Sequence, residues 1–228
     1  MQNQEIYEQL SGLIFSGDYE SGSNLVEREL ASRLGVSRVP VRETLTRMVA
    51  QGVLEGGQRK REGVRIRHYS SDQIRQLYDY RAIIEGGIGR AAAQYASDAD
   101  HFRLAIICDE MESLLDVPDS TRWGALDGKF HEALAEAANN DRFERSLKSL
   151  LKECFYVFYV LARRSSHSTM TPEALRSHKQ QALQDHRAIA EHVKAGDADA
   201  AEERARTHIL RSAERVIRLF IQSDVSEQ

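Results

Sequence analysis

Apolar residues in the amino-terminal third recur at the spacing of amphipathic helices. They predict helices over residues 4–16, 27–34 and 37–52. Gly35 suits the C-terminal cap of the second helix, and Ser37 suits the N-cap of the third. Because so short a connection joins these two helices, the pattern predicts a helix-turn-helix.

A β-hairpin is predicted directly after these helices. The segment Val53-Leu54-Glu55 and the alternating run at residues 64–67 flank a glycine-rich, basic turn. Helix, helix-turn-helix and hairpin in this order describe a winged helix. The tip of its wing holds Arg59, Lys60 and Arg61.

The rest of the chain shows helical periodicity almost without interruption. Helices are predicted near residues 71–96, 98–116, 119–138, 141–164, 172–195 and 197–222. The sequence shows neither a strand pattern nor a glycine-rich phosphate loop here, which argues for a helical bundle and against a nucleotide cofactor. The predicted fold class is mainly α, with a winged helix-turn-helix domain over residues 1–69 and an all-α bundle over residues 70–228.

Composition excludes several classes of protein. The chain has 228 residues, two of them cysteines, and its longest apolar run, residues 154–162, is too short to span a bilayer. Two cysteines form neither a disulfide framework nor a cysteine-rich zinc module, and the first residues lack the features of a signal peptide. We therefore expect a cytoplasmic protein without a membrane partner, and exclude secreted, membrane-spanning and fibrous classes.

The net charge of -4 conceals an uneven distribution along the chain. Residues 1–27 carry five acidic and no basic side chains, and residues 28–67 carry ten basic against four acidic ones. Residues 70–228 are acidic again, with 21 basic and 26 acidic side chains. A basic segment inside an acidic chain is typical of a part that contacts phosphate, although a solvated basic face gives the same count.

Arginines near the start of the predicted third helix favour DNA as the partner. Arg38 and Arg42 lie four residues apart at the end of a recognition helix that enters the major groove. Arg28 lies on the preceding helix, and arginine can pair with guanine or hold phosphates. A plain hairpin of two helices is the alternative, and the combined pattern makes it the weaker interpretation.

The amino-terminal pattern resembles a known family. The run LVERELASRLGVSRVPVRETLTRMVAQGVLE and its glycine-closed hairpin resemble the winged-helix domain of GntR-type bacterial transcription regulators, most specifically in the SR-x-P-VRE core. The resemblance implies that arginines of the two helices read bases and phosphates and that a wing glycine lets the tip enter the minor groove. Thr44 stands where such proteins often have alanine, and the wing tip is more charged than usual. The DNA-binding residues predicted in this way are Arg28, Ser37, Arg38, Arg42, Arg61 and Gly63.

Polar residues inside the predicted carboxy-terminal helices are candidates for a metal site. Asp127 and His131 project from one face of a helix, and His186 and His208 lie on the last two predicted helices. Imidazoles and a carboxylate from three helices of a bundle can bind a first-row metal ion. A surface carboxylate beside a surface histidine, and hydrogen-bonded interface histidines, are the alternatives.

Other histidines compete for the place of His186. His178 lies about 12 Å before it along a helix that rises about 1.5 Å per residue, and His192 points roughly to the opposite face. The spacing admits at most one of the three as a ligand and does not choose among them.

A second resemblance covers the carboxy-terminal part. The D-x3-H stretch at residues 127–140 and the stretch HRAIA…AGDADAA…H at 186–208 resemble the helical effector domain of the FadR subfamily of GntR regulators, the FCD type. The resemblance implies a divalent transition metal, Zn²⁺ or else Ni²⁺ or Mn²⁺. It also places Arg81 where it can face a ligand pocket, with a salt bridge to Glu85 as the alternative. The implied metal ligands are Asp127, His131, His186 and His208.

Together the two resemblances imply a DNA-binding repressor or activator that responds to a small carboxylate effector at the metal. They also imply a homodimer that reads a palindromic operator in double-stranded DNA. A metal-dependent helical enzyme, a regulator that senses the metal itself and a purely structural metal are the alternatives. We expect no enzymatic activity, because the sequence offers no clear additional base, nucleophile or oxygen-activating motif.

Overall fold

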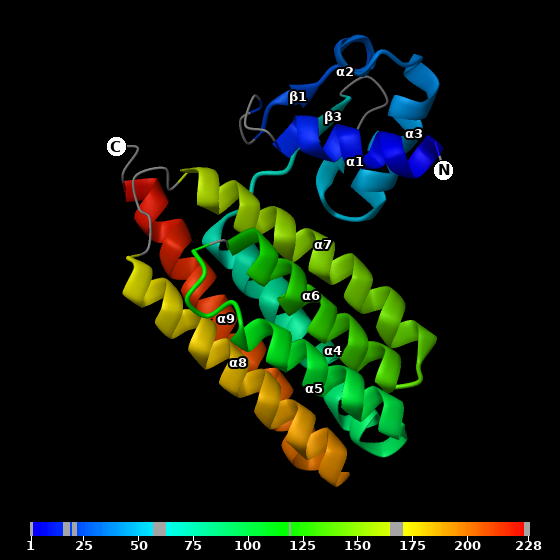
Figure 1. Cartoon of the computed structure of the whole chain (residues 1–228). Helices are drawn as coiled ribbons and strands as arrows, with labels where there is room; N and C mark the ends of the chain where they lie inside the picture. Colours follow the sequence, from blue (N-terminus) through cyan, green and yellow to red (C-terminus); the bar gives the residue numbers. More distant parts are fainter. Residues whose placement is uncertain are drawn as a thin grey trace. The chain divides into compact units, whose positions relative to one another are not determined.

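Two compact units make up the chain (Figure 1). The computed structural model describes residues 2–15, 19, 22–56, 63–118, 120–164 and 171–225. The first unit comprises Met1–Ser70 and Lys152–Ser166, and the second comprises Ser71–Leu151 and His167–Gln228. A segment from the second half of the chain thus groups with the amino-terminal unit, which the sequence pattern does not indicate.

The first unit combines helices with a small antiparallel sheet. Its elements are α1 (Gln2–Phe15), β1 (Asn24–Leu25), α2 (Glu27–Leu34), α3 (Arg38–Ala50), β2 (Leu54–Gly56) and β3 (Val64–Ile66). The strands lie in the order β1-β3-β2, with Leu25 paired to Val64 and Leu54 paired to Ile66. The predicted helices and hairpin are confirmed. Strand β1 is an addition, because two residues are too short to show an alternating pattern.

Apolar faces of α1, α2 and α3 form the core of this unit. The buried side chains are Ile6, Leu10, Ile14, Leu30, Val41, Leu45 and Met48. Gly35 caps α2 in the left-handed conformation (φ 66°), which turns the chain directly into α3. Ser37 occupies the N-cap position of α3, but its side chain makes no capping hydrogen bond. The predicted position of the N-cap is therefore confirmed, although the Ser37 hydroxyl does not bond to the first turn of α3.

Part of helix α7 (Asp141–Arg164) groups with the winged helix. Glu153 accepts hydrogen bonds from the guanidinium of Arg67 at 2.7 Å and from the hydroxyl of Tyr69 at 2.8 Å. The hydroxyl of Tyr156 donates to the backbone carbonyl of Arg67 at 3.0 Å. These bonds connect α7 to the chain that leaves β3.

The second unit is a helical bundle. Besides the first part of α7, it contains α4 (Ser71–Tyr95), α5 (Asp98–Glu112), α6 (Ser120–Ala137), α8 (Pro172–Ala195) and α9 (Ala198–Val225). The predicted helix over residues 98–116 is too long, since α5 ends at Glu112 and a turn follows. Lys179 of α8 donates to the carbonyls of Leu114 at 3.1 Å and Val117 at 2.5 Å, so it satisfies carbonyls in this turn.

Helices α4 and α9 pack especially closely. A Cβ atom built on Gly89 of α4 would lie 2.8 Å from the carbonyl oxygen of Ala201 and 3.2 Å from the Cβ of Ala205. Gly86, one turn earlier, faces Glu202 in the same way at 3.4 Å. Small residues therefore let the two backbones approach.

Replacement of Gly89 by alanine is expected to destabilise the bundle. The added methyl group meets backbone atoms that cannot rotate away, and overpacking of this kind costs about 1–3 kcal/mol. Gly124→Ala is the matched control, because Gly124 lies in α6 with nothing within 4 Å of its Cβ position. There the helix gains about 0.5–1 kcal/mol. Thermal unfolding of the two variants should move in opposite directions, and equal shifts would contradict the close packing.

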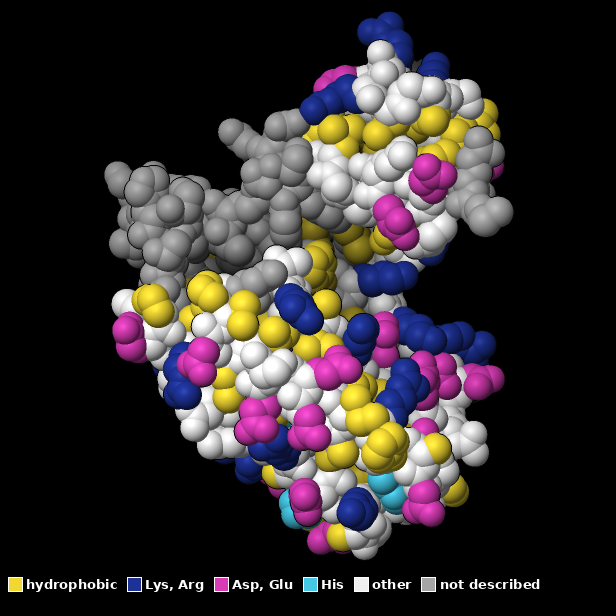
Figure 2. Space-filling model, in the orientation of Figure 1, with side chains coloured by type: hydrophobic (Ala, Val, Ile, Leu, Met, Phe, Trp, Pro, Cys, Tyr) yellow, Lys and Arg dark blue, Asp and Glu magenta, His cyan; other side chains and the backbone are white. Residues whose placement is uncertain are grey.

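Charged side chains of both signs are interspersed over the face of the bundle drawn in Figure 2. Ion pairs also join helices of the bundle, such as that of Arg187 of α8 with Glu112 of α5 at 2.8 Å. Within the described residues, no helix is both long and apolar enough to cross a membrane.

Candidate metal centre and nucleic-acid interface

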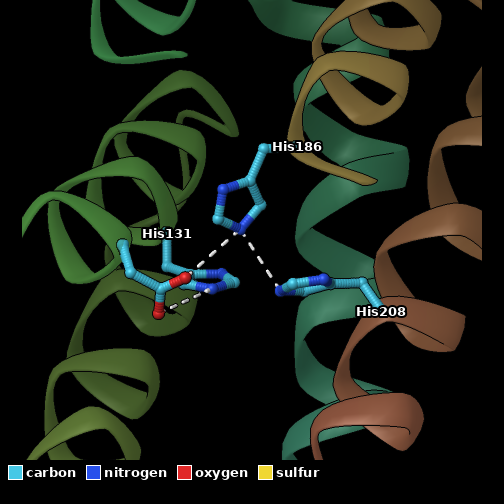
Figure 3. Close-up of side chains that lie close together, drawn as sticks. His131, His186 and His208 are labelled. Carbon is cyan, nitrogen blue, oxygen red and sulfur yellow. Dashed lines mark hydrogen bonds and ion pairs between the residues drawn. The ribbon is translucent and has the colours of Figure 1, made fainter. Parts of the chain in front are cut away.

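Four polar side chains from three helices converge inside the bundle (Figure 3). Asp127 and His131 come from α6, His186 from α8 and His208 from α9. One ligand atom from each lies within 4.8 Å of the ligand atoms of the others. The three imidazoles are buried, whereas the Asp127 side chain is 35% exposed and keeps a route to solvent.

The spacing of the ring nitrogens matches a metal centre. The Nε2 atoms of His186 and His208 lie 3.2 Å apart, and Asp127 Oδ1 lies 3.6 Å from His186 Nε2. Asp127 Oδ2 lies 3.8 Å from His131 Nε2. Ligand nitrogens about 2.1 Å from a tetrahedral zinc ion are about 3.4 Å apart. The donor atoms therefore surround a space of the right size for one ion.

Two buried carboxylates orient the histidines from behind. Glu85 Oε2 of α4 lies 2.5 Å from His131 Nδ1, and Asp185 Oδ2 of α8 lies 3.4 Å from His208 Nδ1. Because an ionised carboxylate only accepts hydrogen bonds, Asp185 favours a proton on Nδ1 of His208 and leaves the lone pair of its Nε2 facing the centre, and the short distance from Glu85 favours the same tautomer of His131. Carboxylates that fix histidine tautomers in this way are typical of metal sites.

Neither of these two carboxylates could be assigned to the site from the sequence alone. Glu85 entered only as a possible partner of Arg81. Asp185 stands next to His186 in the sequence and gave no other signal. It lies on α8, whereas His208, the histidine that it contacts, lies on α9.

Electrostatics favours the neutral forms of His186 and His208 and the charged forms of the carboxylates. Burial lowers the pKa of His186 well below its usual range and also lowers the pKa of His208. Burial raises the pKa of Glu85, but Arg81 and His131 outweigh it and lower that pKa to about 2. Burial likewise raises the pKa of Asp127. The surrounding histidines and Arg81 outweigh this effect, so the pKa of Asp127 is lowered below its usual range. Neutral imidazoles with an anionic carboxylate are the protonation states in which these residues bind a metal.

Arg81 points to the carboxylate of Glu85. Its Nε donates to Glu85 Oε1 at 2.5 Å, and both side chains are buried. The salt bridge considered from the sequence is therefore present. The carboxylate of Glu85 thus lies between Arg81 and His131 and contacts both. A contact between Arg81 and an effector stays a prediction.

The described histidines His101, His178 and His192 lie outside the cluster of candidate ligands. His178 lies against the guanidinium of Arg215, and His101 lies 3.8 Å from Asp98 at the start of α5. His192 is in the last turn of α8. His167 lies outside the described residues. Among the three histidines that spacing left open on α8, the structure brings His186 to the other ligands.

The predicted DNA-binding residues of the helix-turn-helix lie on its exposed surface. Arg28 is exposed on α2, and Arg38 and Arg42 are exposed on the first turns of α3, next to Ser37. Gly63 adopts a left-handed conformation (φ 71°), as expected of a glycine at the base of a wing. Arg61 and the rest of the wing tip, residues 57–62, lie outside the described residues.

Glu27 binds two of the three arginines of α3, Arg38 and Arg42. It accepts two hydrogen bonds from Arg42, at 2.9 and 2.7 Å, and one from Arg38 at 3.4 Å. The hydrogen bond from Arg42 is the main reason that the pKa of Glu27 is lowered. Sequence analysis counted Glu27 only among the acidic residues. The structure shows that it orients the side chains predicted to read DNA.

Comparison with known proteins matches two family models to successive parts of the chain. Residues 2–66 match the model for bacterial regulatory proteins of the gntR family, and residues 76–211 match the model for the FCD domain. A probable D-xylose utilization operon transcriptional repressor of Paenarthrobacter nicotinovorans is 29% identical over 86% of this chain and 80% of its own length. The Glc operon transcriptional activator of Escherichia coli (strain K12) is 30% identical over 64% of each chain. The structure of E. coli McbR/YncC has a TM-score of 0.76 at 16% identity, covering 96% of this chain and 99% of that one.

Proposed function

The chain belongs to the GntR family of bacterial regulatory proteins and carries an FCD domain, and we propose that a small organic acid bound at a metal ion in this domain controls its affinity for an operator. The family places the chain among transcription regulators rather than enzymes. Its relatives include both a repressor and an activator. The sign of the regulation is therefore left open in the proposal.

One observation carries the proposal: ring nitrogens of three buried histidines and the carboxylate of Asp127 offer ligand atoms within 4.8 Å of one another, and His131 Nε2 has no hydrogen-bond partner among the described residues. The Nε2 atoms of His186 and His208 are each other's neighbours at 3.2 Å, and carboxylates behind His131 and His208 favour tautomers with unprotonated Nε2 atoms. Unpaired buried acceptors are unfavourable unless a cation or a donor occupies the space between them. Asp127, His131, His186 and His208 would hold Zn²⁺, or else Ni²⁺ or Mn²⁺.

The charges around the site favour an anionic ligand. Asp127 contributes one negative charge among neutral histidines, so a divalent ion would leave the centre positive. The two carboxylates behind it are already balanced, Glu85 by Arg81 and Asp185 by Arg204 and Arg211 at 3.0 Å. The metal supplies an anchor for a carboxylate when it is bound. The protein orients its ligands, and Arg81 can add a contact if its salt bridge rearranges.

The winged helix supplies the contact with DNA. Arg38 and Arg42 at the start of α3 are placed to reach base edges in the major groove, and Arg28, Ser37, Arg61 and Gly63 would complete the interface with the backbone and minor groove. A homodimer would present two such helices to the halves of a palindromic operator in the cytoplasm. The effector acts by binding the DNA-competent and incompetent arrangements unequally, typically with a coupling of about 1–3 kcal/mol.

Fluorescence anisotropy with operator DNA tests the proposal. The operator is first selected from random double-stranded DNA with the full-length protein loaded with Zn²⁺. Simple carboxylic acids are then expected to change its affinity about 5- to 150-fold when the metal is present. They should have no effect on protein stripped of metal. A change produced by metal alone would instead identify a metal sensor, and an acid effect that survives metal removal would make the metal structural.

A further inference from the structure

A cleft of about 260 Å³ lies between α8 and α9 and has the ligand His208 on its wall. Its lining includes four basic residues, His178, Arg211, Arg215 and Arg218, and two acidic residues, Asp185 and Glu214. His178 is two helical turns before His186 on α8, and Arg215 is two turns after His208 on α9. The cleft therefore extends away from the metal ligands along both helices.

Arg215 is a cation without a carboxylate partner among the described residues. Its guanidinium instead lies against both ring nitrogens of His178, within hydrogen-bonding reach. Asp185, which also lines the cleft, is already paired with Arg204 and Arg211. Burial lowers the pKa of Arg215, because the cost of desolvating the charge outweighs the opposing effects of Tyr78 and Asp127.

His178 supplies an uncharged neighbour to this cation. Burial and the adjacent Arg215 lower the pKa of His178 to about 3, so its ring is neutral near pH 7. A buried cation beside a neutral ring is an unfavourable arrangement unless an anion joins it. The pair can therefore act as a receptor, with the guanidinium donating two hydrogen bonds to an oxyanion and the ring adding another.

The direction of the Arg215 side chain brings it toward the metal ligands. The Cα atoms of His208 and Arg215 are about 10 Å apart on a helix rising about 1.5 Å per residue. Long side chains on a helix extend toward its N-terminus, so the guanidinium of Arg215 reaches back toward His208. The gap between the two anchoring points is thus short enough for one small molecule.

We propose that Arg215 and His178 bind a second anionic group of the effector, which is therefore a small acid with one acidic group at the metal and another at Arg215. The inference rests on the proposed function for the first of these groups. The second group has the chemistry of a carboxylate or a phosphate, since arginine pairs with either through parallel hydrogen bonds. The effector is then a diacid or a phosphorylated acid.

Titration calorimetry of full-length, Zn²⁺-loaded protein tests the assignment. The probes are straight-chain diacids from malonate to adipate, the monoacid of the same carbon number for each, and 3-phosphoglycerate. At least one diacid or the phosphorylated acid is expected to bind about tenfold or more tightly than the monoacids, because it gains a charge-assisted contact. If a diacid binds more tightly than 3-phosphoglycerate, the second acidic group is a carboxylate. If 3-phosphoglycerate binds more tightly, the second group is a phosphate.

Arg215→Gln should remove this preference, while the metal content and the affinity for monoacids stay unchanged. Arg215→Lys should restore part of the preference. Arg218→Gln is the matched control, because it removes one positive charge from an exposed position of the same cleft and should keep the preference. Equal binding of monoacids and diacids to the unmodified protein, or an undiminished preference in Arg215→Gln, overturns the assignment. Failure of every acid to bind the metal-loaded protein overturns the proposed function as well.

Discussion

Protein with His186 replaced by alanine is expected to purify without bound metal and to lose the thermal stabilisation that metal provides. His186 Nε2 is the atom nearest to both Asp127 and His208, so its removal opens the centre of the cluster. Loss of an outer partner of a ligand typically weakens metal binding 10- to 100-fold, and loss of the ligand itself should exceed about 100-fold. Asp127→Asn keeps the shape of the side chain and removes its charge, and should also lose the metal.

Thermal unfolding with and without a chelator measures this effect. Metal at about 1,000 times its Kd stabilises the folded state by about 4 kcal/mol, which corresponds to about 8–16 °C for a chain of this size. The unmodified protein should show this difference, and the two variants should not. His192→Ala is the matched control on α8, since His192 lies outside the cluster, and it should behave like the unmodified protein. Full metal content in Asp127→Asn and His186→Ala would refute the four-ligand centre.

The double variant Arg38→Ala/Arg42→Ala is expected to lose at least about 100-fold in affinity for the selected operator while keeping its fold. A good bidentate contact between arginine and a base provides about 1–3 kcal/mol of discrimination, and the variant removes two candidate contacts. Both side chains are exposed, so their removal leaves the core of the winged helix intact.

Anisotropy over a range of salt concentrations separates the roles of these arginines. Loss of a phosphate contact weakens binding to all sequences and lowers the salt slope by about one, whereas loss of a base contact mainly relaxes specificity. Arg75→Ala/Arg142→Ala removes the same charge from exposed positions of α4 and α7 and should leave operator binding unchanged. Unchanged operator affinity in Arg38→Ala/Arg42→Ala would show that α3 is not the recognition helix.

Most of the fold could be predicted because its elements are long and locally encoded. The helical periodicity of α4 and α6 to α9 is strong enough to place their ends within a few residues. Errors occurred where other parts of the chain decide the structure. Helix α5 is shorter than its pattern because Lys179, distant in sequence, takes up carbonyls of the turn that follows. Strand β1 exists only because β3 pairs with it.

The candidate metal ligands could be predicted from the sequence, but the carboxylates that contact them could not. Spacing identified Asp127 and His131 as a pair on one face of a helix, and the family resemblance selected His186 and His208. The structure brings all four together, although their binding of metal is still a proposal. Glu85, Asp185 and Glu27 could not be recognised, because each acts through a contact on another helix that no sequence period records. Arg215 could not be recognised as an anion receptor, since its lack of a carboxylate partner is a property of three-dimensional packing.

The close packing of α4 on α9 has a consequence for how the site changes its size. Because Gly86 and Gly89 let the two backbones approach closely, a larger side chain at Gly89 would collide with α9, and the two helices form one closely packed wall. That wall carries the ligand His208 and the carboxylate of Glu85 behind His131. The other three ligands lie on α6 and α8. Room for a bulkier acid must therefore come from displacement of α6 or α8. A change of effector during evolution should accordingly spare the glycines of the wall, whichever side chains around the site it replaces.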